Sequence, residues 1–203
     1  MFARTQAASG KRFGEHHELI ASRLLPMLLE GIEDRDRIVV LDVGAGVQST
    51  VDFFGQYNTQ IHFLDLYSSP LLLAPPEEID AETACRLFRE YLSLSEVTFD
   101  ICLFWDALHR IDLPLLRGFS QALRPHLHRD TRGYAFGSLY GNILDHYSYG
   151  IRDSEHLAAR AADTQGRFFT HSQKLIGEHF ESFSIERATL MRTGRLELLL
   201  GAN

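Results

Sequence analysis

A glycine-rich turn and an aspartate that follows it form the part of this sequence best suited to chemistry. The turn belongs to the run Val40-Leu41-Asp42-Val43-Gly44-Ala45-Gly46-Val47-Gln48. Glycines there let the backbone approach a ligand and adopt conformations that a side chain forbids. Asp65 follows Asp42 by 23 positions, near the roughly 20-residue spacing at which a carboxylate binds ribose hydroxyls. The pattern predicts a nucleotide-type site; the alternative is a tight turn with Asp65 capping a loop.

Two neighbouring strands must position these residues. Residues 38–41 and 61–64 are short apolar runs typical of buried parallel strands, and residues 47–57 have helical spacing between them. This is a βαβ unit, so the turn and Asp65 come at the carboxyl ends of adjacent strands. Open α/β sheets bind their ligands at that edge.

Helical and strand patterns alternate along the rest of the chain. We expect helices at residues 13–32, 77–94, 113–123 and 171–179, a helical patch at 155–162, and strands at 99–104, 133–139, 182–191 and 195–201. The fold class predicted is α/β, a Rossmann-like three-layer α/β/α sandwich whose mostly parallel sheet has an antiparallel C-terminal strand. We expect residues 1–203 to form a single domain.

Composition limits the binding partners and the cellular compartment that this protein is expected to have. The formal net charge of −7 disfavours binding to nucleic acid, because phosphates would be repelled. Cys85 and Cys102 lie in a predicted helix and a predicted buried strand, which favours a reducing compartment. The N-terminus lacks the apolar segment of a signal peptide, and no run approaches the roughly 20 apolar residues of a membrane span. These features predict a cytoplasmic protein without a membrane partner.

The ordered motifs resemble the class I S-adenosylmethionine-dependent methyltransferases. Residues 40–46 are similar to the family's first motif, and Asp65 resembles the acid that binds the cofactor ribose. Residues 99–104 and 107–111 are similar to the fourth strand and the Leu-His segment after it. The helix that ends in Leu-Arg-Pro and the C-terminal helix and hairpin also match. The likeness covers about residues 36–138 and 171–203, which leaves residues 140–170 as a possible substrate-side insertion.

The resemblance implies an S-adenosylmethionine cofactor and methyl transfer to a small-molecule or protein acceptor. The cofactor-binding residues that it implies, with neighbours at the same strand ends, are Asp42, Gly44, Ala45, Gly46, Gln48, Asp65, Leu66 and Trp105. Asp106 and His109 are candidate general bases, for acceptors that must lose a proton. Candidate acceptor-lining residues are Tyr140, His146, Tyr147 and Tyr149. For Trp105, His109 and the tyrosines, simple packing is the alternative.

Two departures from the family pattern support a second hypothesis. Gln48 stands where the family often has glycine, and Asp65 and Asp100 are only 35 positions apart, too close for the usual helix, strand and helix. The middle, strand-three region is therefore shortened, and the residue that reads adenine is unassigned. A catalytically inactive scaffold or binding protein would have its cofactor pocket filled by Gln48 or Trp105, whereas an enzyme would have an open cleft.

Two further functions are disfavoured. A nicotinamide oxidoreductase would require another glycine at the position of Ser49. Histidine pairs such as His16 with His17 and His126 with His128 suggest a metal, but none has a convincing set of ligands, so no metal is expected.

Overall fold

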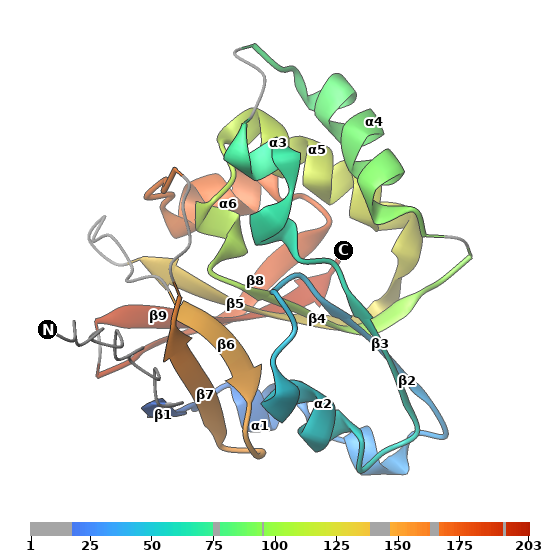
Figure 1. Ribbon diagram of the computed structural model, residues 1–203, viewed down its shortest axis with the longest axis vertical. Helices are drawn as coiled ribbons and strands as arrows, with labels where there is room; N and C mark the ends of the chain where they lie inside the picture. The colour runs from blue at the N-terminus through green and yellow to red at the C-terminus, as the bar shows by residue number, and fades with distance from the viewer. Residues whose placement is uncertain (1–17, 75–77, 95, 139–146, 163–166, 193) are drawn as a thin grey trace, which may run out of the picture.

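The computed structural model describes residues 18–74, 78–94, 96–138, 147–162, 167–192 and 194–203. A six-stranded sheet in the order β3-β2-β4-β5-β9-β8 lies at its centre (Figure 1). Its strands are β2 (Ile38–Asp42), β3 (Thr59–Phe63), β4 (Phe99–Trp105), β5 (Leu127–Ser138), β8 (Phe183–Leu190) and β9 (Arg195–Ala202). Pairing is parallel from β3 to β5, and β9 runs antiparallel to both β5 and β8. The mostly parallel α/β sheet with an antiparallel C-terminal strand is therefore confirmed.

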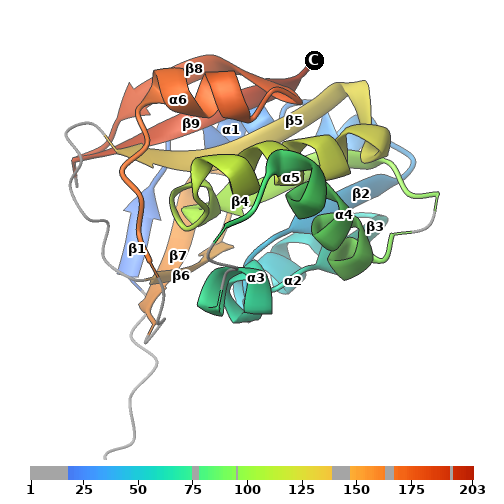
Figure 2. The same ribbon diagram turned by 90° about the horizontal axis from the view of Figure 1, so that it is seen from above.

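Helices cover one face of this sheet, and helices together with a small second sheet cover the other (Figures 1 and 2). The first layer holds α3 (Pro70–Leu73), α4 (Ala81–Leu92), α5 (Leu113–Leu123) and α6 (Gln173–His179). The second holds α1 (Leu25–Leu28), α2 (Gln48–Phe54) and a sheet of β1 (Glu18–Ala21), β7 (His156–Ala161) and β6 (Tyr147–Ile151), in the order β1-β7-β6. Each layer has its own apolar core against the central sheet, because the sheet is buried on both faces.

The helix α5 shows how local sequence sets these elements. Asp112 caps its N-terminus by accepting a hydrogen bond from the Leu115 amide at 2.9 Å. Pro114 occupies the first turn, where its missing N–H leaves no gap in the hydrogen bonding. Gly118 faces α4, where a Cβ would come within 2.7 Å of the Cys85 backbone nitrogen. The glycine thus permits close contact between the two helices.

The shortened middle of the chain is visible in the sheet. Between Asp65 and Asp100, the described residues form the short 3-10 helix η2 (Leu66–Ser68), α3 and α4, and no strand before Phe99. Consequently β3 is an edge of the central sheet. No helix within the described residues is long and apolar enough to cross a membrane.

Two predictions of helix were wrong. In the stretch 13–32, the described part begins with β1, which pairs antiparallel with β7, and only Leu25–Leu28 is α-helical. Pro26 lies in the first turn of that helix and Gly31 follows it with a φ of 74°, so neither residue supports a long helix. The patch at 155–162 contains the strand β7, which pairs antiparallel with β1 on one side and with β6 on the other.

Candidate functional site

The glycine turn lies where the sequence predicts it, between β2 and α2. Gly46 has a φ of 71°, in the left-handed region that a side chain would make costly. Ala45 and Gly46 are exposed, whereas Gly44 is buried. The turn therefore presents an open half around Gly46 and a covered half around Gly44.

Asp42, the last residue of β2, points its carboxylate into the covered half. Its Oδ1 accepts hydrogen bonds from the Gly44 amide at 2.8 Å and from the Trp105 Nε1–H at 2.7 Å. Its Oδ2 is buried without a partner among the described residues. Burial raises the pKa of Asp42 from its ordinary 3.8 to about 6, although the bonds from Trp105 and Gly44 oppose the rise. Both donors to this carboxylate from the described part of the chain are neutral, and neither is a cation.

Trp105, the last residue of β4, covers this carboxylate. A Cβ on Gly44 would meet the indole Cδ1 at 3.1 Å, so the ring lies directly on the first glycine. The indole is 1% exposed and stacks on Tyr149 of β6, with ring centroids 5.8 Å apart. Its backbone has a φ of 50°, a conformation that costs a bulky residue of order 1–3 kcal/mol. The surrounding contacts hold Trp105 in a strained position over the turn.

Asp65 lies in the open half, just after β3. Its amide donates to the Gly44 carbonyl at 3.2 Å, which joins the two loops. Its Oδ1 is buried and has no partner within the described residues. Phe63 beside it is 42% exposed and would lie 3.2 Å from a Cβ on Gly46. A partnerless acceptor and an exposed ring thus flank the glycine turn.

Asp106 is buried and engaged by side chains of its own neighbourhood. Its Oδ2 accepts hydrogen bonds from the Arg110 guanidinium, with the ion pair at 3.1 Å, and its Oδ1 accepts one from the Tyr67 hydroxyl. Burial and this carboxylate hold the pKa of Tyr67 well above its usual range. Both carboxylate oxygens of Asp106 therefore have donors in this conformation.

His109 lies in the same interior, in the 3-10 helix η3 (Ala107–His109). Its Nδ1 lies 2.9 Å from the Phe169 carbonyl, and the ring is stacked between Phe168 and His171. Burial lowers the pKa of His109, against the effect of the Phe169 carbonyl. The imidazole is therefore neutral near pH 7 and closed off from solvent.

The other predicted residues are divided between surface and core. Gln48 is exposed and donates its amide to Asp52 at 2.7 Å, so it does not fill the turn. Leu66 is fully buried, and its amide donates to the Val43 carbonyl. Tyr147 is half-buried and Tyr149 is buried against Trp105. Tyr140 and His146 lie outside the described residues.

The strand β6 packs over Trp105 and so helps to cover the half of the glycine turn around Gly44. Gly150 crosses the N-terminus of α2, where a Cβ would meet the Thr50 Oγ1 at 3.0 Å. The Ile151 amide donates to that same hydroxyl at 3.1 Å. Arg195 of β9 donates to the Tyr149 hydroxyl, and its guanidinium carbon lies 5.7 Å from the centre of the Tyr149 ring. Segments that are distant in sequence therefore hold Tyr149 on Trp105.

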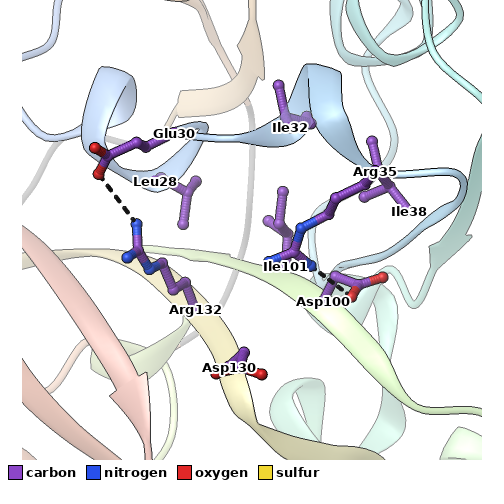
Figure 3. A pocket seen from close by; sticks show the side chains of 9 residues that line it. All are labelled: Leu28, Glu30, Ile32, Arg35, Ile38, Asp100, Ile101, Asp130 and Arg132. Atoms are coloured by element: carbon purple, nitrogen blue, oxygen red, sulfur yellow. Dashed lines mark hydrogen bonds and ion pairs between the residues drawn. The ribbon is translucent and has the colours of Figure 1, made fainter.

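A pocket lies away from the glycine turn, at the amino ends of β2 and β4 (Figure 3). Arg35 pairs there with Asp100 at 2.7 Å, and Arg132 pairs with Glu30 at 3.8 Å. Both arginines are thus already paired with carboxylates. In the described part of the chain, no group of three His, Cys, Asp or Glu residues could hold a metal.

Sequence reasoning missed several residues of this region. Phe63 reads as an ordinary strand residue, although its place two residues before Asp65 marks the edge of the site. Tyr67, Arg110 and Arg195 contact the predicted residues from separate elements. Only the i, i+4 spacing of Asp106 and Arg110 in the sequence indicates one of these contacts.

The strand order, the antiparallel β9 and the turn after β2 define the class I methyltransferase fold. No protein-family model and no curated protein matches the chain. Among solved structures, the chain is similar to the PH0226 protein of Pyrococcus horikoshii OT3, with 15% identity, a TM-score of 0.53, and 89% of this chain and 88% of that chain covered.

Two further solved structures are similar at lower TM-scores. One is the 1,6-didemethyltoxoflavin-N1-methyltransferase of Burkholderia thailandensis, with 17% identity, a TM-score of 0.48, and coverage of 89% of this chain and 77% of that one. The other is the pyocyanin biosynthetic protein PhzM, with 13% identity, a TM-score of 0.45, and coverage of 88% and 55%. The chain thus spans about half the length of PhzM. At these identities, likeness concerns the fold alone.

Proposed function

We propose that the chain binds S-adenosylmethionine and transfers its methyl group to a small-molecule or protein acceptor in the cytoplasm. The observation that carries this proposal is the buried, partnerless Oδ1 of Asp65 beside the exposed glycine turn. A carboxylate oxygen in that position requires donors, and the two hydroxyls of a ribose are suitable donors. The Burkholderia thailandensis methyltransferase was solved with 1,6-didemethyltoxoflavin and S-adenosylhomocysteine bound.

The residues present fit the two polar ends of the cofactor. Asp65 would hold the ribose, and the partnerless Oδ2 of Asp42 would accept the ammonium group of the amino-acid tail. When bound, the cofactor supplies a methyl group already activated by a sulfonium. The chain would contribute by holding the ligand in line with the acceptor and excluding water at the ends of β2 and β4. Asp106 and His109 remain candidate bases only if their present contacts are released.

Calorimetric titration with S-adenosylmethionine and S-adenosylhomocysteine tests this function. We expect one-to-one binding that Asp65→Ala weakens by about 1–3 kcal/mol, because a hydrogen-bonded carboxylate is lost. Asp34→Ala is the matched control, since Asp34 is an exposed carboxylate before β2, at the other end of the strands. Binding that is equally strong in Asp65→Ala would remove Asp65 from the site.

A specific observation favours a second function. Trp105 covers Asp42 and packs on Gly44, as expected of a methyltransferase-fold protein that serves as a scaffold. Gln48, the other residue considered for filling the pocket, points along α2 instead. A folded sample that binds neither cofactor form would support the scaffold function and direct the search to protein partners.

A further inference from the structure

The Asp65 end and the Asp42 end of the candidate site differ in solvent exposure, and the Trp105 side chain causes the difference. Around Asp65 the turn is open: Ala45 and Gly46 are exposed and Phe63 is 42% exposed. Around Asp42 it is sealed, since both Asp42 and Trp105 are at most 1% exposed. The ribose end of a ligand therefore meets exposed residues beside Asp65, although the Asp65 Oδ1 itself is buried. An amino-acid tail meets the Trp105 indole.

We propose that Trp105 decides which ligands the site accepts: with its indole on Asp42 the site takes a nucleoside, and a ligand with an amino-acid tail enters only when the indole leaves. This rests on the proposed function and deepens it. In the open state Asp42 Oδ1 loses the indole N–H and keeps the Gly44 amide, while Oδ2 gains the ammonium group of the tail.

Side-chain contacts hold the indole of Trp105 on the turn. Its hydrogen bond to Asp42 at 2.7 Å and its stacking on Tyr149 hold the indole in place. Its backbone is left-handed, with a φ of 50°, so these contacts also hold the residue in a main-chain conformation that is costly for a bulky side chain. The indole also packs on Tyr134 and Phe136 of β5, with ring centroids 6.0 and 6.5 Å away, so leaving the turn breaks contacts with both β5 and β6.

The strand β6 controls this exchange through Tyr149. Tyr149 contacts Trp105 from above, and Arg195 holds its hydroxyl. Because Tyr149 is itself packed on Phe136 at 4.6 Å, the indole cannot move outward unless β6 gives way. Tyr149 and Arg195 are therefore positioning residues for the closed state.

Single-tryptophan fluorescence tests the proposal on the wild-type chain, because Trp105 is its one tryptophan. We expect S-adenosylhomocysteine to shift the emission to longer wavelength and to increase quenching by acrylamide, as the indole leaves its buried position. Adenosine, which lacks the tail, should bind without either change. Binding of S-adenosylhomocysteine with unchanged emission and quenching would overturn the proposal.

Affinity ratios provide the second test. If the closed form dominates by ten to one, removing the indole should tighten binding of S-adenosylhomocysteine about tenfold. The variant is Trp105→Gly, which also suits the left-handed backbone; adenosine affinity should change less than about twofold. The control is Phe88→Leu, which lies in the core on the opposite face of the central sheet. This substitution loosens the core without touching Trp105, so it should leave the ratio of the S-adenosylhomocysteine and adenosine affinities unchanged.

The outcomes separate the two proposals. If both ligands bind and their affinity ratio is the same in wild type and Trp105→Gly, the role of Trp105 is disproved while the binding function stands. If neither ligand binds to the folded wild type or to the variant, the binding function itself fails. Should Trp105→Gly not fold, the wild-type fluorescence result decides.

Discussion

At the scale of single residues, two buried carboxylates dominate this region and have opposite surroundings. Asp106 has an ion pair with Arg110, whereas within the described residues Asp42 has two neutral donors and one oxygen without a partner. A buried charge without a cation is costly, and it raises the pKa. We therefore expect the stability of the fold to depend on pH through Asp42 and on the cationic partner of Asp106.

Asp42 should make stability depend on pH. Its folded-state pKa of about 6 lies above the ordinary 3.8, so the folded state binds the proton more tightly and its contribution to stability is lost as pH rises from about 4 to about 6. Compared with Asp42→Asn, the wild type should lose on the order of 3 kcal/mol across this range. Urea unfolding of both proteins from pH 4 to 7 measures this, and a constant difference would contradict it.

Arg110 should be essential for folding. Arg110→Gln leaves the Asp106 carboxylate buried without its cation, which costs about 3–5 kcal/mol. The control is Arg86→Gln, because Arg86 pairs with Glu90 at 3.8 Å on the exposed face of α4 and such pairs contribute at most about 1 kcal/mol. Thermal melts of the two variants compare these costs. Equal melting temperatures would show that the buried pair is dispensable.

At the scale of elements, the close contact between α4 and α5 holds the helices on one face of the sheet. The contact depends on Gly118, whose missing Cβ leaves room for the α4 backbone at Cys85. Where two helix backbones approach this closely, even a methyl group forces them apart.

Gly118→Ala should therefore destabilise the fold by about 1–3 kcal/mol, despite the better helix propensity of alanine. Gly177→Ala in α6 is the matched control, since Gly177 is exposed and a Cβ there meets nothing within 4 Å. The control should gain about 0.5–1 kcal/mol. Chemical unfolding measures the change in the free energy of unfolding for each variant. If both substitutions raise that free energy, α4 and α5 can move apart without cost and the prediction is wrong.

At the scale of the whole molecule, the C-terminal strand secures the beginning of the described chain. Glu197 of β9 is 1% exposed, and its Oε2 accepts hydrogen bonds from the amides of Arg23 and Leu24 at 2.9 and 3.2 Å. Its Oε1 accepts one from the Tyr134 hydroxyl at 3.0 Å. A single carboxylate thus joins α1, β5 and β9.

Glu197→Ala should loosen this junction. Two buried donors, the Leu24 amide and the Tyr134 hydroxyl, and the part-buried Arg23 amide lose their acceptor. We expect a loss of about 2–4 kcal/mol together with faster amide exchange at Arg23 and Leu24. Tyr134→Phe removes one donor only and should have a smaller effect, without faster exchange at Arg23. Hydrogen-exchange measurements on the three proteins follow these amides, and unchanged protection in Glu197→Ala would refute the role of Glu197.

The sequence by itself determined the parallel sheet, the helix α5 and the C-terminal hairpin. These elements have uninterrupted apolar periodicity and local start and stop signals, such as Asp112 before α5, so nearby residues define them. The glycine turn and Asp65 could be located for the same reason, since both follow recognisable strands. The lost middle strand was evident from the short spacing between Asp65 and Asp100.

Only the tertiary structure decided what surrounds those residues. The strands β1 and β7 were predicted as helix, because four- to six-residue segments have weak periodicity and their pairing is with distant chain. The hydrogen bond from Trp105 to Asp42 spans 63 positions, and the bond from Arg195 to Tyr149 spans 46. Contacts at such separations leave no local pattern in a sequence. The residue types predicted a nucleotide site, and the packing of Trp105 determined how much of it is open.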